Sequence, residues 1–201
     1  SILTGANRTY SAESAITDSA PAATALATGY KSNSGYVGVL PSKITSPGVA
    51  QNEADAFKPI ANVLEGAKRV GKATGIVATA EIQHATPAGF SAHVVSRSNY
   101  DDIAEQQVYQ GIDVVLGGGA ASLKDTRKDG ENLISVIEKN GYDFVQTREQ
   151  LLASDADKIW GSFAPTALAY DIDRATTKPE EPTLAEMTEK AIDTLNKDED
   201  G

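Results

Sequence analysis

Residues 59–80 read PIANVLEGAKRVGKATGIVATA, and this stretch decides the fold. After Pro59, apolar residues recur with the spacing of one helix face until Gly71. These residues are Ile60, Val63, Leu64, Ala67 and Val70. Residues 74–80 then form a short apolar run, which is typical of a strand buried in a parallel sheet. Such sheets bind ligands beyond the carboxyl ends of their strands, here residues 81–86.

Further elements of the same kinds follow along the chain. Residues 113–116 and 142–146 are expected to be strands, and residues 132–140 a helix. Thr147 with Gln150, and Thr183 with Glu186, fit the capping box that opens a helix. We therefore predict an α/β fold with three layers, in which helices flank a mainly parallel central sheet.

Composition limits the function classes. The chain has 201 residues, with 18 Lys and Arg against 28 Asp and Glu, a formal net charge of −10. A nucleic-acid partner is not expected, because proteins that bind phosphate backbones present a basic face. A membrane partner is not expected either, because the sequence lacks a run of about 20 apolar residues. With two histidines and no cysteine, the chain can hardly build a catalytic zinc site alone.

The segment with the clearest chemical potential is TDSAPAATALATG, residues 17–29. It reads as a cap followed by a helix of small residues that ends at Gly29. Ser19 falls in the first turn, where free backbone N–H groups and the helix dipole favour an anion. The pattern alone favours the simpler interpretation, that Asp18 or Ser19 only caps the helix, because Asp and Ser are the commonest capping residues.

Residues 17–31 resemble the nucleophile segment of alkaline phosphatases. The resemblance continues in the same order along the chain, and four segments carry it in all. The other three are AEIQHATPA at 80–88 with AHV and SR at 92–97, DVVLGGGA at 113–120, and PTLAEMT at 182–188.

The resemblance implies a role for each of five residues. Ser19 is the nucleophile that becomes a phosphoserine, and Asp18 orients the arginine that binds phosphate. Arg97 is that arginine, whose planar fork suits two phosphoryl oxygens. Thr86 is a hydroxyl ligand of magnesium, and His84 lies beside that ion. Without the resemblance, Arg97 reads as a surface charge, Thr86 as a turn residue and His84 as a packing residue.

The same resemblance implies cofactors that this chain does not hold by itself. The family uses two zinc ions and one magnesium ion, and its zinc ligands lie mostly downstream of residue 201, with one Asp upstream of residue 18. None of these zinc ligands is found in the sequence. We therefore expect residues 1–201 to be a single partial domain, an internal fragment that lacks activity alone. His93 is expected to be a structural residue in a helix.

The expected substrates are phosphomonoesters, the expected location is periplasmic or secreted, and a homodimer is a further expectation. A sulfatase is a weaker alternative, because Ala23 stands where the sulfatase pattern requires Arg. A P-loop at residues 117–119 fails, because no Lys-Ser/Thr pair follows the glycines. The alternative from another class is a noncatalytic module that binds phosphate or a partner at Ser19.

Overall fold

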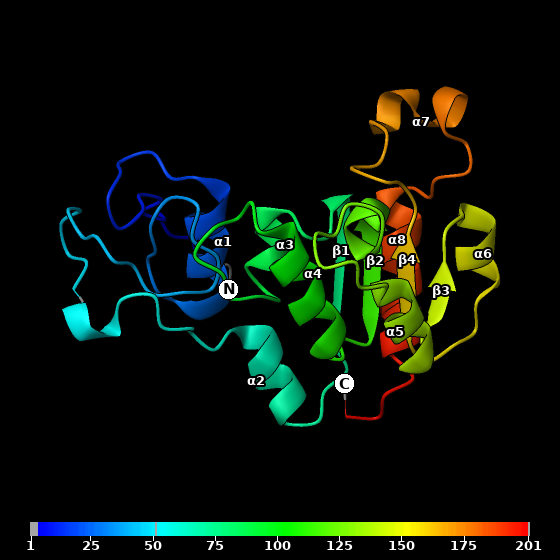
Figure 1. Ribbon diagram of the computed structural model, residues 1–201, viewed down its shortest axis with the longest axis horizontal. Helices are drawn as coiled ribbons and strands as arrows, with labels where there is room; N and C mark the ends of the chain where they lie inside the picture. Colours follow the sequence, from blue (N-terminus) through cyan, green and yellow to red (C-terminus); the bar gives the residue numbers. More distant parts are fainter. Residues whose placement is uncertain (1–3, 51, 201) are drawn as a thin grey trace.

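Residues 4–50 and 52–200 are described by the computed structural model (Figure 1). This part of the chain contains one four-stranded sheet with the order β1-β2-β4-β3. Its strands are β1 (Gly75–Glu81), β2 (Val114–Gly118), β3 (Asp143–Val145) and β4 (Ile159–Ser162). All three strand pairings are parallel, which confirms the expected fold class.

Helices cover both faces of this sheet. On one face, α4 (Tyr100–Tyr109) and α5 (Leu133–Lys139) pack against Val115 and Trp160. On the other face, α6 (Arg148–Ala153) and α8 (Leu184–Leu195) pack against Val114 and Leu116. Neighbouring residues of β2 thus belong to opposite cores, as the alternation of side chains along a strand requires. The result is a three-layer α/β/α arrangement.

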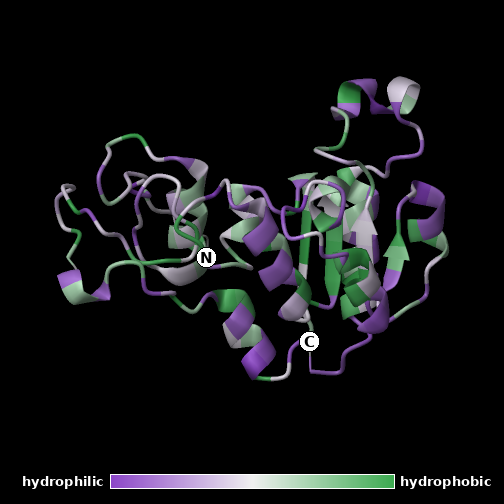
Figure 2. Ribbon diagram, viewed as in Figure 1, coloured by the Kyte–Doolittle hydropathy of each residue, from purple (hydrophilic) through white to green (hydrophobic). Residues whose placement is uncertain are grey.

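The strands form the apolar centre of the molecule. Figure 2 shows apolar residues concentrated in β1 and β2, while the flanking helices turn polar residues outward. Every residue of β2 and β4 is buried, whereas β1, at the edge of the sheet, is half-buried over most of its length. An edge position for so apolar a strand leaves a hydrophobic surface beside β1.

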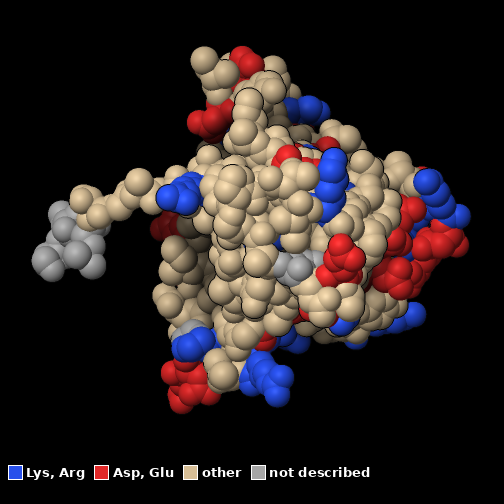
Figure 3. Space-filling model, turned by 90° about the vertical axis from the view of Figure 1, so that its left-hand side faces the viewer, with Lys and Arg blue, Asp and Glu red and all other residues tan. Residues whose placement is uncertain are grey.

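The N-terminal part of the chain forms a lobe beside β1 (Figure 1). It contains α1 (Ser19–Thr28), the short 3₁₀ turn η1 (Glu53–Asp55) and α2 (Val63–Arg69). α3 (Ala85–Ala88) follows β1 and packs on α1 through small buried residues. Figure 3 views this side of the molecule, which is mostly uncharged, with acidic and basic side chains grouped toward its margins. The remaining elements are η2 (Ala120–Leu123) and α7 (Asp171–Thr177).

Several element boundaries differ from the sequence expectation. α2 begins at Val63 and not at Ile60, because Asn62 and Glu65 form a reciprocal capping box there. The expected box at Thr183 forms in full, but the one at Thr147 is half formed. There the amide oxygen of Gln150 accepts from the N–H of Gln146, one residue before the cap.

Candidate active site

Asp18 and Ser19 form the head of α1, which packs beside α3. Asp18 occupies the N-cap position with extended dihedral angles, φ −80° and ψ 159°. Within the described residues its side chain caps no amide of α1. Instead, Asp18 Oδ2 accepts from the N–H of Gly35 at 2.9 Å. Asp18 therefore occupies the N-cap position, as the simpler interpretation has it, but its carboxylate serves another contact than capping.

That contact is the guanidinium of Arg97. Arg97 Nη1 donates to Asp18 Oδ1 and, at 2.7 Å, to the hydroxyl oxygen of Ser19. The Ser19 hydroxyl lies 3.3 Å from Asp18 Oδ1 as well. A cation beside a hydroxyl favours its deprotonated form and attracts anions to the same place. Ser19, Asp18 and Arg97 therefore form one cluster, made of residues to which the family resemblance assigns a role.

The surroundings of Asp18 lower its pKa and favour its charged form. Burial raises the pKa of Asp18, but the N–H of Gly35 and the positive charge of Arg97 outweigh it and leave that pKa below its usual value. A carboxylate with a lowered pKa is a weak general base. Asp18 is therefore suited to hold Arg97 in place and poorly suited to take the proton of Ser19.

His84 joins the same cluster from α3. It occupies the N-cap position of α3, and within the described chain it makes no side-chain cap bond, just as Asp18 makes none for α1. Its Nε2 atom lies 3.0 Å from Arg97 Nη2. The N-cap side chains of two helices thus meet the two ends of one guanidinium fork. Sequence reasoning placed His84 near the site but did not predict this contact.

Gly35 supports the cluster, and sequence reasoning missed it. Its N–H donates to Asp18, and its carbonyl accepts from the backbone N–H of Arg97 at 2.7 Å. Gly35 has φ 79°, a conformation that glycine adopts without strain. Because its contacts are all through the backbone, no side-chain pattern in the sequence could have indicated them.

Thr86 lies on the neighbouring surface and not in the cluster itself. It is exposed in the first turn of α3, and none of the hydrogen bonds within residues 4–50 and 52–200 joins it to Ser19 or Arg97. Thr86 and His84 line a cavity of about 700 Å³ beside the free edge of β1. Its hydroxyl is thus open to a ligand, while His84 Nε2 already faces Arg97.

Both histidines of the chain are already engaged through hydrogen bonds in the structure. His93 has both ring nitrogens engaged, Nδ1 with the carbonyl of Gly38 at 2.7 Å and Nε2 with Glu65 Oε1 at 2.8 Å. His93 lies in the loop after α3 and not in a helix, so that part of the expectation is wrong. The ring thereby joins the loop after α3 to the backbone of Gly38 and to the side chain of Glu65. With His84 turned to Arg97, neither histidine offers a free Nε2 for zinc.

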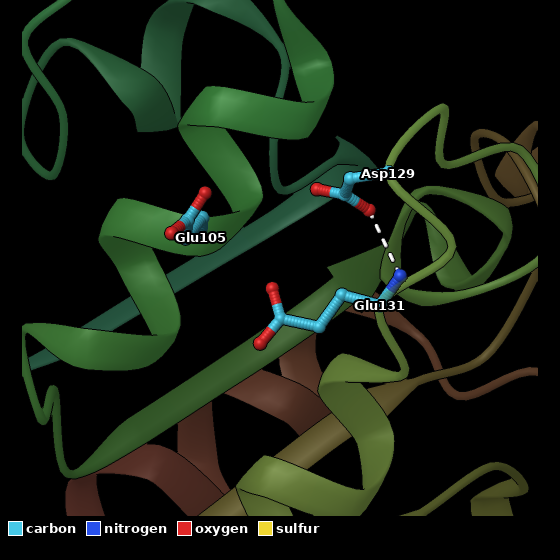
Figure 4. Close-up of side chains that lie close together, drawn as sticks. All are labelled: Glu105, Asp129 and Glu131. Atoms are coloured by element: carbon cyan, nitrogen blue, oxygen red, sulfur yellow. Dashed lines mark hydrogen bonds between the residues drawn. The ribbon is translucent and has the colours of Figure 1, made fainter.

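One group of three acidic side chains in the described chain has ligand atoms close enough for a metal ion (Figure 4). Glu105, Asp129 and Glu131 supply it. However, the fully buried guanidinium of Arg127 pairs with Asp129, and its Nη2 lies 3.5 Å from Glu131 and 3.9 Å from Glu105. Arg127 offsets one of the three negative charges, and its guanidinium already donates hydrogen bonds to Asp129 and Glu131. The group is an ion-pair cluster that ties the loop after η2 to α4.

Comparisons with known proteins agree with one another. The sequence matches the alkaline phosphatase family over residues 2–201. It is 42% identical to alkaline phosphatase 3 of Bacillus subtilis over 207 residues, which cover 99% of this chain and 40% of the relative.

Solved structures give the same result. Thermus thermophilus alkaline phosphatase superposes with a TM-score of 0.85 at 34% identity, covering 96% of this chain and 38% of that one. A variant of the alkaline phosphatase from the Antarctic bacterium TAB5, with Mg bound in its M3 site, gives a TM-score of 0.77 at 26% identity, covering 95% and 50%. The chain thus spans two fifths to one half of these proteins. The chain belongs to the alkaline phosphatase family.

Proposed function

We propose that these residues supply the nucleophile half of a phosphomonoesterase site in a longer alkaline phosphatase. The observation that carries this proposal is the hydrogen bond of 2.7 Å between Arg97 Nη1 and the Ser19 hydroxyl at the head of α1. The head of α1 thus brings together a nucleophile, a fixed cation and the backbone N–H groups of the first helical turn, which have no acceptor within the helix. Transfer of a phosphoryl group uses all three: the nucleophile attacks phosphorus, and the cation and N–H groups bind its oxygens.

In the proposed reaction, Ser19 Oγ attacks the phosphorus atom of the ester. The new Oγ–P bond forms while the ester P–O bond breaks, and the alcohol leaves with a proton. Water then displaces Ser19 from the phosphoserine, releasing inorganic phosphate and restoring the hydroxyl. Arg97 binds two phosphoryl oxygens through its fork and offsets charge that builds up on them.

Asp18 and His84 are assigned to hold that fork. Asp18 fixes one end of the guanidinium and His84 the other, so the remaining N–H groups of Arg97 point in a set direction. A guanidinium that is already oriented loses less side-chain entropy when phosphate binds. This arrangement supports roles in positioning for both residues.

The metal ions of the proposed enzyme need ligands beyond those described. Thr86 offers one neutral oxygen, which suits magnesium as one ligand of a set, and the two histidines do not form a zinc site. The Mg bound in the M3 site of the TAB5 variant supports a magnesium ion in the longer protein. In such enzymes bound metal ions activate hydroxyl groups and offset phosphoryl charge. Zinc and magnesium ligation is therefore assigned to the longer protein.

The whole protein is further proposed to act on phosphomonoesters outside the cytoplasm, as a periplasmic or secreted enzyme, and to form a homodimer. Among the described residues, no helix has the length and apolar character needed to cross a bilayer. The family relationship supports the substrate class.

Activity measurements on the 201-residue chain and on the full-length protein test the proposal. We expect zinc-dependent hydrolysis of a phosphomonoester such as p-nitrophenyl phosphate by the full-length protein and negligible turnover by the chain. Inorganic phosphate should bind to the chain and not to its Arg97→Ala variant. Turnover by the pure chain would refute the division of the site. Phosphate binding without any turnover in the full-length protein would favour a noncatalytic module.

A further inference from the structure

The three glycines at the end of β2 have no part in the chemistry proposed above, yet they are tightly enclosed. A Cβ on Gly117 would lie 2.7 Å from the carbonyl oxygen of Ala78, and one on Gly118 would overlap the carbonyl oxygen of Thr166. Two of the three places where a side chain would stand are therefore filled by backbone. The segment is shaped for close approach of other chain segments and not for a ligand.

Gly119 faces the turn that leads into α3. A Cβ on Gly119 would overlap the side-chain oxygen Oε1 of Gln83 and lie 3.2 Å from Cβ of Glu81. Gln83 is 1% exposed, so its amide has no room to swing into solvent. Within the described residues, Gln83 Oε1 is also without a hydrogen-bond partner. The Gln83 amide is therefore packed directly against the backbone of Gly119 inside the core.

The residue that follows Gln83 is His84. The turn between β1 and α3 is closed by the His84 N–H, which donates to the carbonyl of Glu81 at 2.8 Å. Beyond it, the His84 ring meets Arg97 Nη2 at 3.0 Å. Because Gln83 and His84 are adjacent in the chain, a shift of Gln83 would also move the His84 ring that contacts Arg97 Nη2.

We propose that Gly119 is a positioning residue for the active site. Because Gly119 has no side chain, the Gln83 amide can occupy the space beside it. The position of Gln83 in turn fixes where the His84 ring lies relative to the Arg97 guanidinium. This inference rests on the proposed function, because it assigns the position of His84 to the orientation of the phosphate-binding arginine. It also gives the last glycine of the run, which follows β2, a specific purpose.

Gly119 has φ 91°, so alanine there strains the backbone as well as meeting Gln83. A matched control separates these effects. Gly141 has φ 84°, and a Cβ on it would meet nothing within 4 Å among the described residues. Gly141→Ala therefore carries the same kind of strain without the steric contact, and it lies between α5 and β3, away from His84.

The test is a double-variant cycle in the 201-residue chain, read by the imidazole ¹H–¹⁵N signals. The chain has two histidines, so His93 serves as an internal reference. We expect Gly119→Ala and Gln83→Ala each to shift the His84 signals while those of His93 stay in place. In the double variant, the new methyl group fills the space that the amide leaves, and the His84 signals return toward the parent positions. Gly141→Ala should leave both sets unchanged.

Inorganic phosphate provides a second readout. Gly119→Ala should raise its dissociation constant severalfold, and the double variant should recover most of that loss. Equal effects of Gly119→Ala and Gly141→Ala, or additive effects in the double variant, would overturn the proposal. If Gly119→Ala fails to fold, Gln83→Ala decides alone, and unchanged His84 signals there would also overturn it. Because the signals do not depend on hydrolysis, an inactive full-length protein would refute the proposed function and leave this inference standing.

Discussion

Arg97 Nη1 lies 2.7 Å from the hydroxyl oxygen of Ser19, although 78 residues separate the two in the chain. The backbone at each residue holds these two side chains in place. Ser19 is fixed at the head of α1, and the backbone of Arg97 is tied to Gly35, whose N–H also holds Asp18. The packing of the N-terminal lobe against the segment before α4 therefore sets this contact.

Replacing Arg97 by lysine tests the need for a fork. Lysine keeps the charge but has one nitrogen, which cannot reach Asp18, Ser19 and His84 together. We expect Arg97→Lys to weaken binding of inorganic phosphate to the chain by tenfold or more, about 1.4 kcal/mol or above, measured by isothermal titration calorimetry. Arg69→Lys, at an exposed position in α2, is the matched control and should bind like the parent. If the two variants bound phosphate with equal affinity, the role of Arg97 in phosphate binding would be contradicted.

The N-terminal cap of α8 gives a stability prediction away from the site. Thr183 accepts from the N–H of Glu186 at 3.1 Å, and Glu186 reaches back to the N–H of Thr183 at 2.9 Å. Thr183→Ala should lower the free energy of unfolding by about 1 kcal/mol. For a chain of this size that corresponds to about 2–4 °C in Tm.

A second threonine of α8 is the control for this change. Thr188 bonds back to the carbonyl of Leu184 in the helix and caps nothing in the described chain. Thr188→Ala should therefore leave Tm within about 1 °C of the parent or raise it, because alanine is the better helix former. Similar losses for both variants would show that the cap has no special weight.

Acid stability should depend on Glu186. Its hydrogen bonds with Arg148, and then its bonds with Thr183, lower its pKa from 4.5 to about 2. A carboxyl whose pKa is lower in the folded state stabilises the fold above its unfolded pKa and loses that effect as pH falls through the folded value. The contribution is therefore complete above about pH 4.5 and is lost toward about pH 2.

Denaturant unfolding at pH 6, 4 and 3 measures this effect. The parent should lose little of the Glu186 contribution between pH 6 and about 4.5 and progressively more from there to pH 3. Glu186→Gln should lose less below about pH 4.5, because it has no such proton to gain. Glu189→Gln, at an exposed position on the same helix, should follow the parent. An unchanged pH slope in Glu186→Gln would contradict the assignment. Asp18 contributes in the same direction, because its pKa is also lowered in the fold.

The sequence predicted the parts of the fold that carry strong local signals. Residues 74–80 and 113–116 are recognisable as strands because they are short and mostly apolar, and they correspond to β1 and β2. β4 was missed because its four residues, Ile159–Ser162, alternate too briefly to show a period. α4 was missed because its apolar residues, Ile103, Ala104 and Val108, make a narrow stripe in a polar segment.

The site divides in the same way. Ser19, Asp18 and Arg97 stand in motifs, so their proximity could be predicted from sequence. The contact of His84 with Arg97 could not, since it depends on how the turn after β1 sits on Gly119. Long-range packing and backbone contacts such as those of Gly35 leave no periodic trace in the residues themselves. The missed features are therefore tertiary ones.

The most direct test of the central claim is the location of the phosphoryl group during turnover. The full-length protein is mixed with a phosphomonoester, quenched in acid and mapped by mass spectrometry, with Ser19→Ala and Ser135→Ala as test and control variants. We predict phosphoserine at Ser19 in the parent and in Ser135→Ala, and loss of both phosphoserine and turnover in Ser19→Ala. Turnover at the parent rate in Ser19→Ala, or phosphate on another residue, would contradict the account.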